Sequence, residues 1–256
     1  MLTTELYEKI EKVLPESLCC TWDNDGISVL PSPVHESKKV LIALDITESV
    51  LKYAKENGFD TVIAHHPLIF KPLTSLKGDD AVSSRALYAI RENIALMSFH
   101  TRLDASEYGI NMKTAEKLGF ATITPFIFEG ERIGFTGEYS TPVLFETMLE
   151  RVKEVTKCPA PTYASPNEYV KKVVLVSGSF SEGAEGARSV GADTFITGEI
   201  KYHALLDSYD TGIGCIAADH YHSEIISKEC LHGILKDIDG IEAVIYPEEG
   251  VLKYAL

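Results

Sequence analysis

The chain repeats itself, and this repeat constrains the fold more than any other feature of the sequence. Residues 38–66, KKVLIALDITESVLKYAKENGFDTVIAHH, align without a gap over residues 171–199, KKVVLVSGSFSEGAEGARSVGADTFITGE. The segments coincide at eight positions, among them a Lys-Lys pair, a glycine and an Asp-Thr pair. Chance likeness between two strand–helix–strand units is the alternative. The favoured interpretation is an α/β fold of two related halves, with mostly parallel sheets that face a central cleft.

Short apolar runs alternate with helical patterns along the whole chain, which is typical of such a fold. The predicted strands are residues 40–44, 61–64, 94–99, 173–177, 194–197 and 213–218. Helices are expected at residues 48–56, 81–92, 182–190 and 200–208, and a last long helix at 221–236. We place the first half at residues 1–120. Residues 121–256 hold a connecting segment (121–169) and the second half, whose C-terminal elements are able to pack back on the first.

Composition excludes several classes of protein. The net charge of -14 argues against nucleic acid as the main partner, because phosphate binding needs a positive face. No run of about 18 apolar residues predicts a membrane helix, and the N-terminus predicts an amphipathic helix in place of a signal peptide. The five cysteines include no CxxC pair, so we expect a reduced, cytoplasmic protein.

Histidines stand at the end of one predicted strand. His65 and His66 follow the apolar run at residues 61–64, and Pro67 then forces the chain to turn. Ligands of open α/β sheets bind beyond the carboxyl ends of the strands, so both imidazoles can lean toward one crevice. One imidazole per ion would let this adjacent pair serve a two-metal centre.

Two further pairs have the spacing i, i+4, which places both side chains on one face of a helical turn. They are His100 with Asp104 and His220 with Glu224, each just past a predicted strand. Imidazole and carboxylate are the ligands of zinc, iron and manganese hydrolytic centres, whose two ions lie about 3.5–4 Å apart. Singly, such pairs are more often accidental or solvated ion pairs. Their convergence from three strands favours a metal site.

Five motifs stand in order along nearly the whole chain: WDNDGISVL (22–30), HHPLIF (65–70), HTRLDASEYGIN (100–111), ITGEIKYH (196–203) and DHYHSE (219–224). Together they resemble the YbgI family of dinuclear metal-centre proteins. This family is also called the NGG-interacting factor three-like family, and its members are often labelled GTP cyclohydrolase one type two homologs. The resemblance implies two divalent metal ions per chain, held by His65, His66, Asp104, His220 and a bridging Glu224. It also implies a toroidal homohexamer whose metal centres face an internal cavity.

The chain departs from the family pattern at three positions. Asn is usual where Arg102 stands, and Gly is usual where Tyr108 and Asp219 stand. None of the three is an implied ligand. The departures bear on the polarity of the cavity and hence on the substrate.

Other residues are predicted to act on the substrate. His100 is placed to support a ligand or to act as a general acid or base. Glu199 stands where the first half has His66, so we predict it as a second catalytic residue. Lys201, His203 and Arg102 are the predicted substrate-binding residues. A solvated helix N-terminus is the alternative for the segment that begins at Glu199.

Two classes of function fit these residues. The first is a metal-dependent hydrolase that cuts a ring C–N bond of a small molecule, such as a nucleotide in the manner of a GTP cyclohydrolase, with phosphoester hydrolysis as a variant. The second is a non-catalytic metal chaperone or regulatory scaffold. A metal that only pins the halves together is disfavoured, because structural sites use sulfur and no cysteine stands near the motifs. Zinc, iron, manganese and nickel all suit this ligand set.

Overall fold

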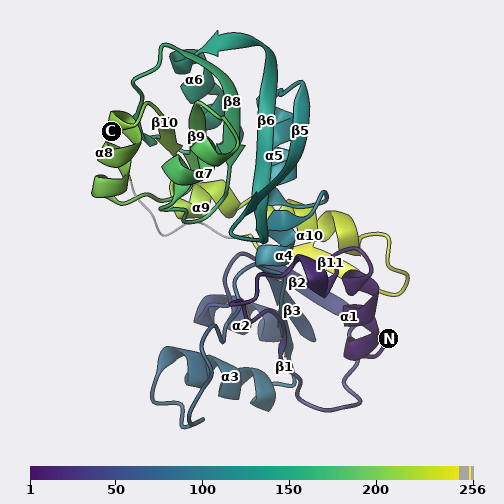
Figure 1. The fold of residues 1–256 in the computed structure, drawn as a ribbon. Helices are drawn as coiled ribbons and strands as arrows, with labels where there is room; N and C mark the ends of the chain where they lie inside the picture. The colour runs from purple at the N-terminus through teal and green to yellow at the C-terminus, as the bar shows by residue number, and fades with distance from the viewer. Residues whose placement is uncertain (248–253, 255–256) are drawn as a thin grey trace. The chain divides into compact units, whose positions relative to one another are not determined.

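The structure is a computed structural model that describes residues 1–247 and 254. The chain has an α/β fold and divides into two compact units (Figure 1). Unit 1 comprises Met1–Leu103 and residues 227–247, and unit 2 comprises Asp104–Ile226 and Tyr254. Among the described residues, no helix is long and apolar enough to cross a membrane.

Unit 1 is built on a five-stranded sheet in the order β1-β4-β3-β2-β11. Its strands are β1 (Gly26–Val29), β2 (Lys39–Ala43), β3 (Thr61–Ala64), β4 (Ala95–Ser98) and β11 (Glu242–Ile245). All neighbours pair in parallel except β1, which is antiparallel to β4 at the edge. The helices of the unit are α1 (Thr3–Glu11), η1 (Glu16–Leu18), α2 (Glu48–Glu56), α3 (Ala81–Arg91) and α10 (Ser227–Leu235).

Alternate side chains of the central strands bury one face of this sheet under α2 and α3. Leu41 and Ala43 of β2, Val62 and Ala64 of β3, and Leu96 of β4 share one core with these helices. The C-terminal strand β11 lies beside β2, so segments from both ends of the chain meet in this unit (Figure 1). β3 and β4 are therefore both central strands, each hydrogen-bonded to a neighbour on either side up to its carboxyl end.

Unit 2 holds a six-stranded sheet in the order β5-β6-β8-β9-β10-β7. The strands are β5 (Thr122–Phe128), β6 (Glu131–Leu144), β7 (Thr162–Ala164), β8 (Tyr169–Leu175), β9 (Thr194–Thr197) and β10 (Gly214–Ala217). The three central strands β8, β9 and β10 are parallel, and the others are antiparallel to their neighbours. The helices are α5 (Ile110–Leu118), α6 (Phe145–Thr156), α7 (Gly183–Ser189), α8 (Tyr202–Asp210) and α9 (His220–Glu224); α4 (Thr101–Ala105) contains the boundary between the units.

Residues that alternate along β8 separate two cores in unit 2. Val173 and Leu175 pack with α5 and α6, whereas Val174 and Val176 pack on the side of α7 and α8. Helices thus cover both faces of the parallel strands, which is why these strands are apolar on both sides.

The repeat is confirmed in the backbone. The order β4-β3-β2 in unit 1 matches β10-β9-β8 in unit 2. Asp60 accepts hydrogen bonds from the backbone N–H groups of Lys38 and Lys39 at 3.0 to 3.1 Å. Asp193 does the same for Lys171 and Lys172, at 2.8 and 3.0 Å. The shared Lys-Lys and Asp residues therefore have the same role in both units: their hydrogen bonds link two neighbouring parallel strands near their N-terminal ends.

Three features differ from the sequence-based expectations. The units divide between residues 103 and 104, earlier than the expected division after residue 120, because α5 packs on the second sheet. The segment 121–169, in which the sequence predicts two β runs and one helix, contributes three strands, β5, β6 and β7, to that sheet. The predicted long helix at 221–236 is two helices, with a turn at Ile225 and Ile226, where two adjacent β-branched residues lower helix propensity.

Candidate functional site

Three imidazoles converge at the carboxyl ends of β3 and β4 in unit 1. The ring centroids of His65 and His66 are 4.9 Å apart, and His100 lies 5.2 and 5.6 Å from them. One ring nitrogen from each of the three lies within 4.8 Å of the others. His65 is fully buried, and His66 and His100 are partly buried. The strand end thus brings together the adjacent pair and His100, as the motifs predicted.

The ring orientation of each imidazole is fixed by the same kind of contact. Nδ1 of His65 donates to the carbonyl of Phe99 at 3.1 Å, and Nδ1 of His66 donates to Asp45 at 2.8 Å. Nδ1 of His100 donates to Asp23 at 2.9 Å. Because these oxygens only accept, Nδ1 carries the proton and the lone pair of each neutral ring is on Nε2. Histidines that bind metals are oriented in this way.

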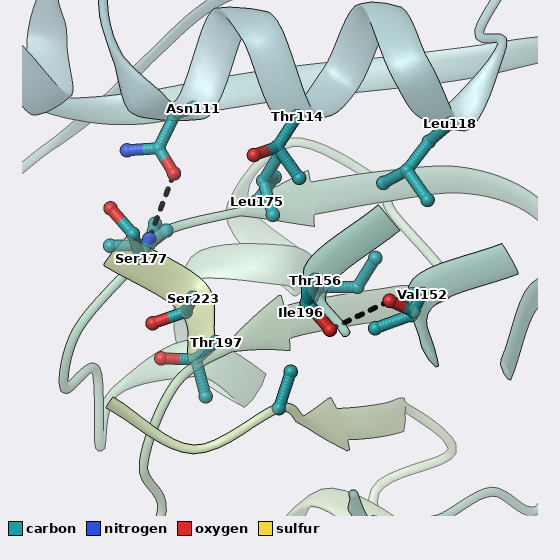
Figure 2. A pocket seen from close by; sticks show the side chains of 12 residues that line it. Asn111, Thr114, Leu118, Val152, Thr156, Leu175, Ser177, Ile196, Thr197 and Ser223 are labelled. Atoms are coloured by element: carbon teal, nitrogen blue, oxygen red, sulfur yellow. Dashed lines mark hydrogen bonds between the residues drawn. The ribbon is translucent and has the colours of Figure 1, made fainter. Parts of the chain in front are cut away.

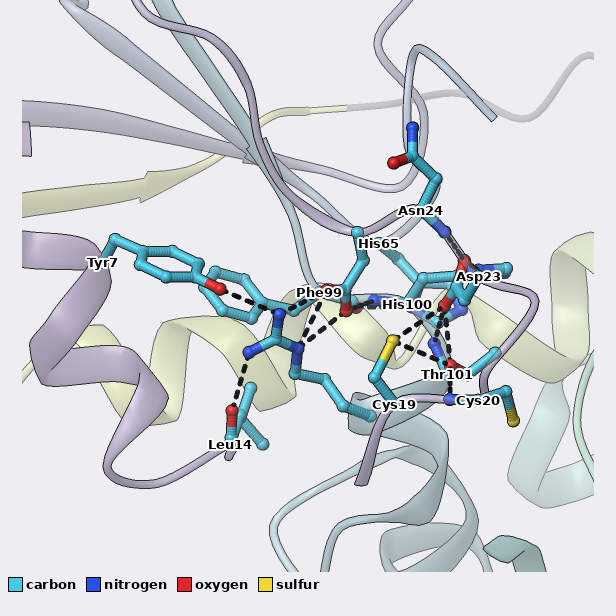
Figure 3. A network of polar contacts seen from close by, with 12 residues as sticks. Tyr7, Leu14, Cys19, Cys20, Asp23, Asn24, His65, Phe99, His100 and Thr101 are labelled. Carbon is cyan, nitrogen blue, oxygen red and sulfur yellow. Dashed lines mark hydrogen bonds and ion pairs between the residues drawn. The ribbon is translucent and has the colours of Figure 1, made fainter. Parts of the chain in front are cut away.

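Asp23 is the centre of a polar network behind His100 (Figure 3). Its side chain is fully buried, and it also accepts from the hydroxyl and backbone N–H of Thr101 at 2.6 and 3.1 Å. Burial alone raises the pKa of Asp23. The hydrogen bonds from His100 and Thr101, with the positive charge that His100 carries when it is protonated, outweigh burial and hold the pKa well below its usual range. Asp23 is therefore a carboxylate, and it holds His100 in place.

Arg102 has a structural role in unit 1. Its side chain is 1% exposed and contacts the carboxylate of Asp25, the hydroxyl of Tyr7 and the carbonyl of Leu14. Burial lowers the pKa of Arg102, but the bonds to Asp25 more than reverse this, so the side chain stays charged. Its predicted contact with a substrate stays a prediction.

In unit 2, Asp104 is held by two residues that sequence reasoning left without a role. Ser177 donates from its hydroxyl to Asp104 Oδ1 at 2.9 Å, and Asn111 donates to the Asp104 carbonyl at 3.2 Å. Asn111 in turn accepts from the backbone N–H of Ser177 at 2.8 Å (Figure 2). Asn111 and Ser177 border a small cavity of about 10 Å³, the size that holds one water molecule. The signal for Asn111 was its place in the motif HTRLDASEYGIN.

The second acid of unit 2 is buried beside a histidine. Glu224 is 2% exposed, and its Oε2 lies 3.0 Å from Nε2 of His220 one helical turn away in α9. Gly178 makes room for this carboxylate, since a Cβ at that residue would clash with it. On its other side, Nδ1 of His220 lies 3.4 Å from Oε2 of Glu199.

One predicted catalytic residue, Glu199, and one predicted substrate-binding residue, Lys201, border the same open cavity in unit 2. This cavity has a volume of about 420 Å³, within the range of small-molecule sites, and is lined by Glu199 and Lys201 together with Ser179 and Asp219. His203 is exposed on α8 and is absent from this lining. The cavity therefore groups two acids, Glu199 and Asp219, with one base, Lys201, that an anionic group of a small molecule could contact.

The donor set suits divalent metal ions. Unit 1 offers imidazoles whose orientation is fixed by oxygen acceptors, and unit 2 offers the carboxylates of Asp104 and Glu224 with the imidazole of His220. Nitrogen and oxygen donors of this kind bind zinc, iron or manganese. The expectation that no cysteine lies near the motifs was wrong, because Cys158 Sγ is 3.7 Å from Asp219 Oδ2. That contact joins residues 61 positions apart, and no local pattern reveals it.

Comparisons with known proteins identify the family. The family described as Duf34/NIF3 (NGG1p interacting factor 3) matches residues 1–249. A Clostridium perfringens protein named GTP cyclohydrolase 1 type 2 homolog is 30% identical over 230 residues, covering 88% of this chain and 87% of the relative. A hypothetical Staphylococcus aureus protein of known structure is 26% identical, with a TM-score of 0.87 over 100% of this chain and 99% of that chain.

A structural neighbour of unknown function, YbgI, has the same fold, with a TM-score of 0.85 and 23% identity over 96% of this chain and 98% of that chain. The resemblance that the five motifs carry is therefore confirmed along nearly the whole sequence. The chain belongs to the Duf34/NIF3 (NGG1p interacting factor 3) family.

Proposed function

We propose that this protein is a metal-dependent hydrolase that binds two divalent ions through His65, His66, Asp104, His220 and Glu224. The observation that carries the proposal is the set of imidazoles in unit 1, each fixed through Nδ1 by an oxygen acceptor. Core histidines need only one satisfied nitrogen each, whereas here the ligand nitrogens also gather within 4.8 Å. Such an arrangement is typical of metal ligands.

Different side chains would have different roles in the reaction. The bound ions would supply a water of lowered pKa as the nucleophile. His100, oriented by Asp23, would take a proton from the attacking water at Nε2 and pass it to the leaving nitrogen of the substrate. Glu199, 3.4 Å from His220, would orient that imidazole from the cavity side. Lys201 would attract an anionic group of the substrate into the cavity that it lines.

A planar ring is the substrate group that we favour, with opening of a ring C–N bond as the reaction. Exposed aromatic side chains flank His100, since the rings of Trp22 and Phe70 have centroids 6.3 and 6.2 Å from its ring. These side chains are 59% and 44% exposed, an apolar surface on which a heterocycle could stack. The Clostridium relative bears the name of a GTP cyclohydrolase homolog, so GTP is the first substrate to test.

Assembly and location belong to the same proposal. We expect a toroidal homohexamer, which light scattering would report as a mass six times the 28.2 kDa of one chain. The five cysteines are all free thiols, which suits a reducing compartment such as the cytoplasm.

The test combines metal content with turnover. Wild-type protein purified without a His-tag should contain about two transition-metal ions per chain, the number expected of a two-metal centre. Asp104→Ala should lose metal, whereas Glu185→Gln, an exposed acid in unit 2, should retain it. Absence of metal from the wild type, even after reconstitution, would overturn the proposal.

Turnover then separates the hydrolase from a non-catalytic metal protein. GTP, cyclic amides and phosphoesters are the candidate substrates, and Trp22, the only tryptophan, reports their binding by fluorescence. His100→Gln should keep the metal and lower kcat by about 100-fold or more. Unchanged turnover in this variant would remove His100 from the mechanism, and no turnover on any substrate would favour the chaperone or scaffold. Hydrolysis of phosphoesters alone would replace the ring-opening reaction.

A further inference from the structure

Cys158, Asp219 and His222 form a group of metal-ligand types in unit 2 that the proposed two-metal centre does not use. The Cys158 thiol donates to Asp219 Oδ2 at 3.7 Å, and Nδ1 of His222 lies 2.7 Å from the same oxygen. One ligand atom from each residue lies within 4.8 Å of the other two. The Tyr254 hydroxyl contacts Asp219 and lies 3.0 Å from Nδ1 of His222. Sulfur, nitrogen and oxygen donors thus surround one point.

We propose that Cys158, Asp219 and His222 bind a thiophilic divalent cation, such as Zn²⁺, at a site separate from the two-metal centre. Zinc takes thiolate, imidazole and carboxylate at about 2.3, 2.0 and 2.0 Å, and tetrahedral angles then place sulfur and oxygen about 3.5 Å apart. The observed 3.7 Å between Cys158 and Asp219 already fits. His222 has to turn slightly as the ion replaces its hydrogen bond, and the thiol proton leaves to solvent. Tyr254 or a water completes the four ligands.

The site has a path to solvent. Cys158 is 1% exposed, but Asp219 lines the open cavity of about 420 Å³, as does Ala160, two residues beyond Cys158. An ion could therefore enter beside the Asp219 carboxylate. A buried soft ligand with a partly exposed carboxylate at the cavity wall is an arrangement that a metal ion can reach without unfolding the chain.

The geometry does not suit a nucleophilic cysteine. In a thiol catalyst the imidazole contacts the sulfur and the carboxylate orients the imidazole. Here Asp219 is in the middle and bonds to both Cys158 and His222. Burial, together with the charge of Asp219, raises the pKa of Cys158 and keeps the thiol protonated. A metal ion, which replaces that proton, is the ligand that the group fits.

Cobalt titration tests the site, because Co²⁺ replaces zinc and a cysteine ligand gives it a sulfur-to-metal charge-transfer band in the near ultraviolet. The proposed two-metal centre has no sulfur ligand, so the band reports only a cysteine site. Because the two-metal centre competes for Co²⁺, the metal-free wild type should show the full band by about three equivalents per chain. Asp104→Ala should retain the band. Cys158→Ser should lose it, whereas Cys215→Ser, which removes another buried thiol of unit 2, should not.

Asp219→Gly is the second variant. Asp219 has a φ of 49°, a conformation that glycine adopts without strain, so this variant removes the carboxylate and keeps the backbone. Its affinity for Co²⁺ should fall at least tenfold, while its circular dichroism matches the wild type. The proposal is overturned if the wild type shows no band at millimolar Co²⁺. It is also overturned if the band survives Cys158→Ser or is lost with Cys215→Ser. Unchanged affinity in Asp219→Gly, or loss of the band in Asp104→Ala, overturns it equally.

Discussion

At the scale of single residues, Asp23 shows how a buried charge serves both stability and the site. It accepts hydrogen bonds from His100 and Thr101, and these lower its pKa in spite of burial. An unfolded aspartate has a pKa of about 4. Because the folded pKa lies below that value, Asp23 stabilises the fold fully above pH 4, and this contribution is lost as the pH falls through the folded pKa.

Replacing Asp23 with Asn should therefore destabilise the protein most at neutral pH. We expect a loss of about 1–3 kcal/mol in the free energy of unfolding at pH 7, since a buried charged acceptor disappears. The loss should shrink below pH 4, where Asp23 of the unfolded wild type takes up a proton and the wild type begins to lose this stabilisation. Denaturant unfolding at both pH values measures the difference. Asp79→Asn, an exposed aspartate of the same unit, should show no such change, and a loss that is constant with pH would contradict the role of the charge.

At the scale of secondary-structure elements, the sequence predicted most of the strands and helices that lie within the two repeated segments. The predicted bounds of β3 and β9 match the structure, and α2 matches at both ends, because apolar runs and turn residues mark these elements locally. The turn at Ile225 has no proline or glycine to mark it, so it was missed. The convergence of His65, His66 and His100 followed from the topology of parallel strands. The hydrogen bonds that Asp23 makes to His100 and Ser177 makes to Asp104 could not be predicted in this way, because they depend on loops whose position the sequence pattern does not give.

The repeat also predicts equal effects from equivalent substitutions. Asp60 and Asp193 each bond to the N–H groups of a Lys-Lys pair and to the hydroxyl of the next threonine. Asp60→Asn and Asp193→Asn should each lower the free energy of unfolding by about 1–3 kcal/mol, because one carboxylate accepts several backbone donors. Denaturant unfolding measures both, with the exposed Asp210→Asn as control. A large loss for one variant and none for the other would show that the two positions are not equivalent.

At the scale of the whole molecule, the proposed ligands come from both units, with His65 and His66 in unit 1 and Asp104, His220 and Glu224 in unit 2. Metal that binds only the folded chain stabilises it by mass action, by about 2.7 kcal/mol when free metal is 100 times its Kd. Chelation should therefore lower the Tm, which differential scanning calorimetry measures.

Variants from each unit make this prediction specific. The chelator-dependent fall in Tm should disappear in His66→Gln and in Glu224→Gln, because each substitution removes one proposed ligand and so weakens metal binding. It should persist in Glu185→Gln, whose carboxylate is exposed on α7. All chains would carry Cys158→Ser, so that the second cation site contributes nothing. A fall that disappears in only one of the two ligand variants would show that the other residue does not hold the metal, and the proposed set of ligands would have to be abandoned.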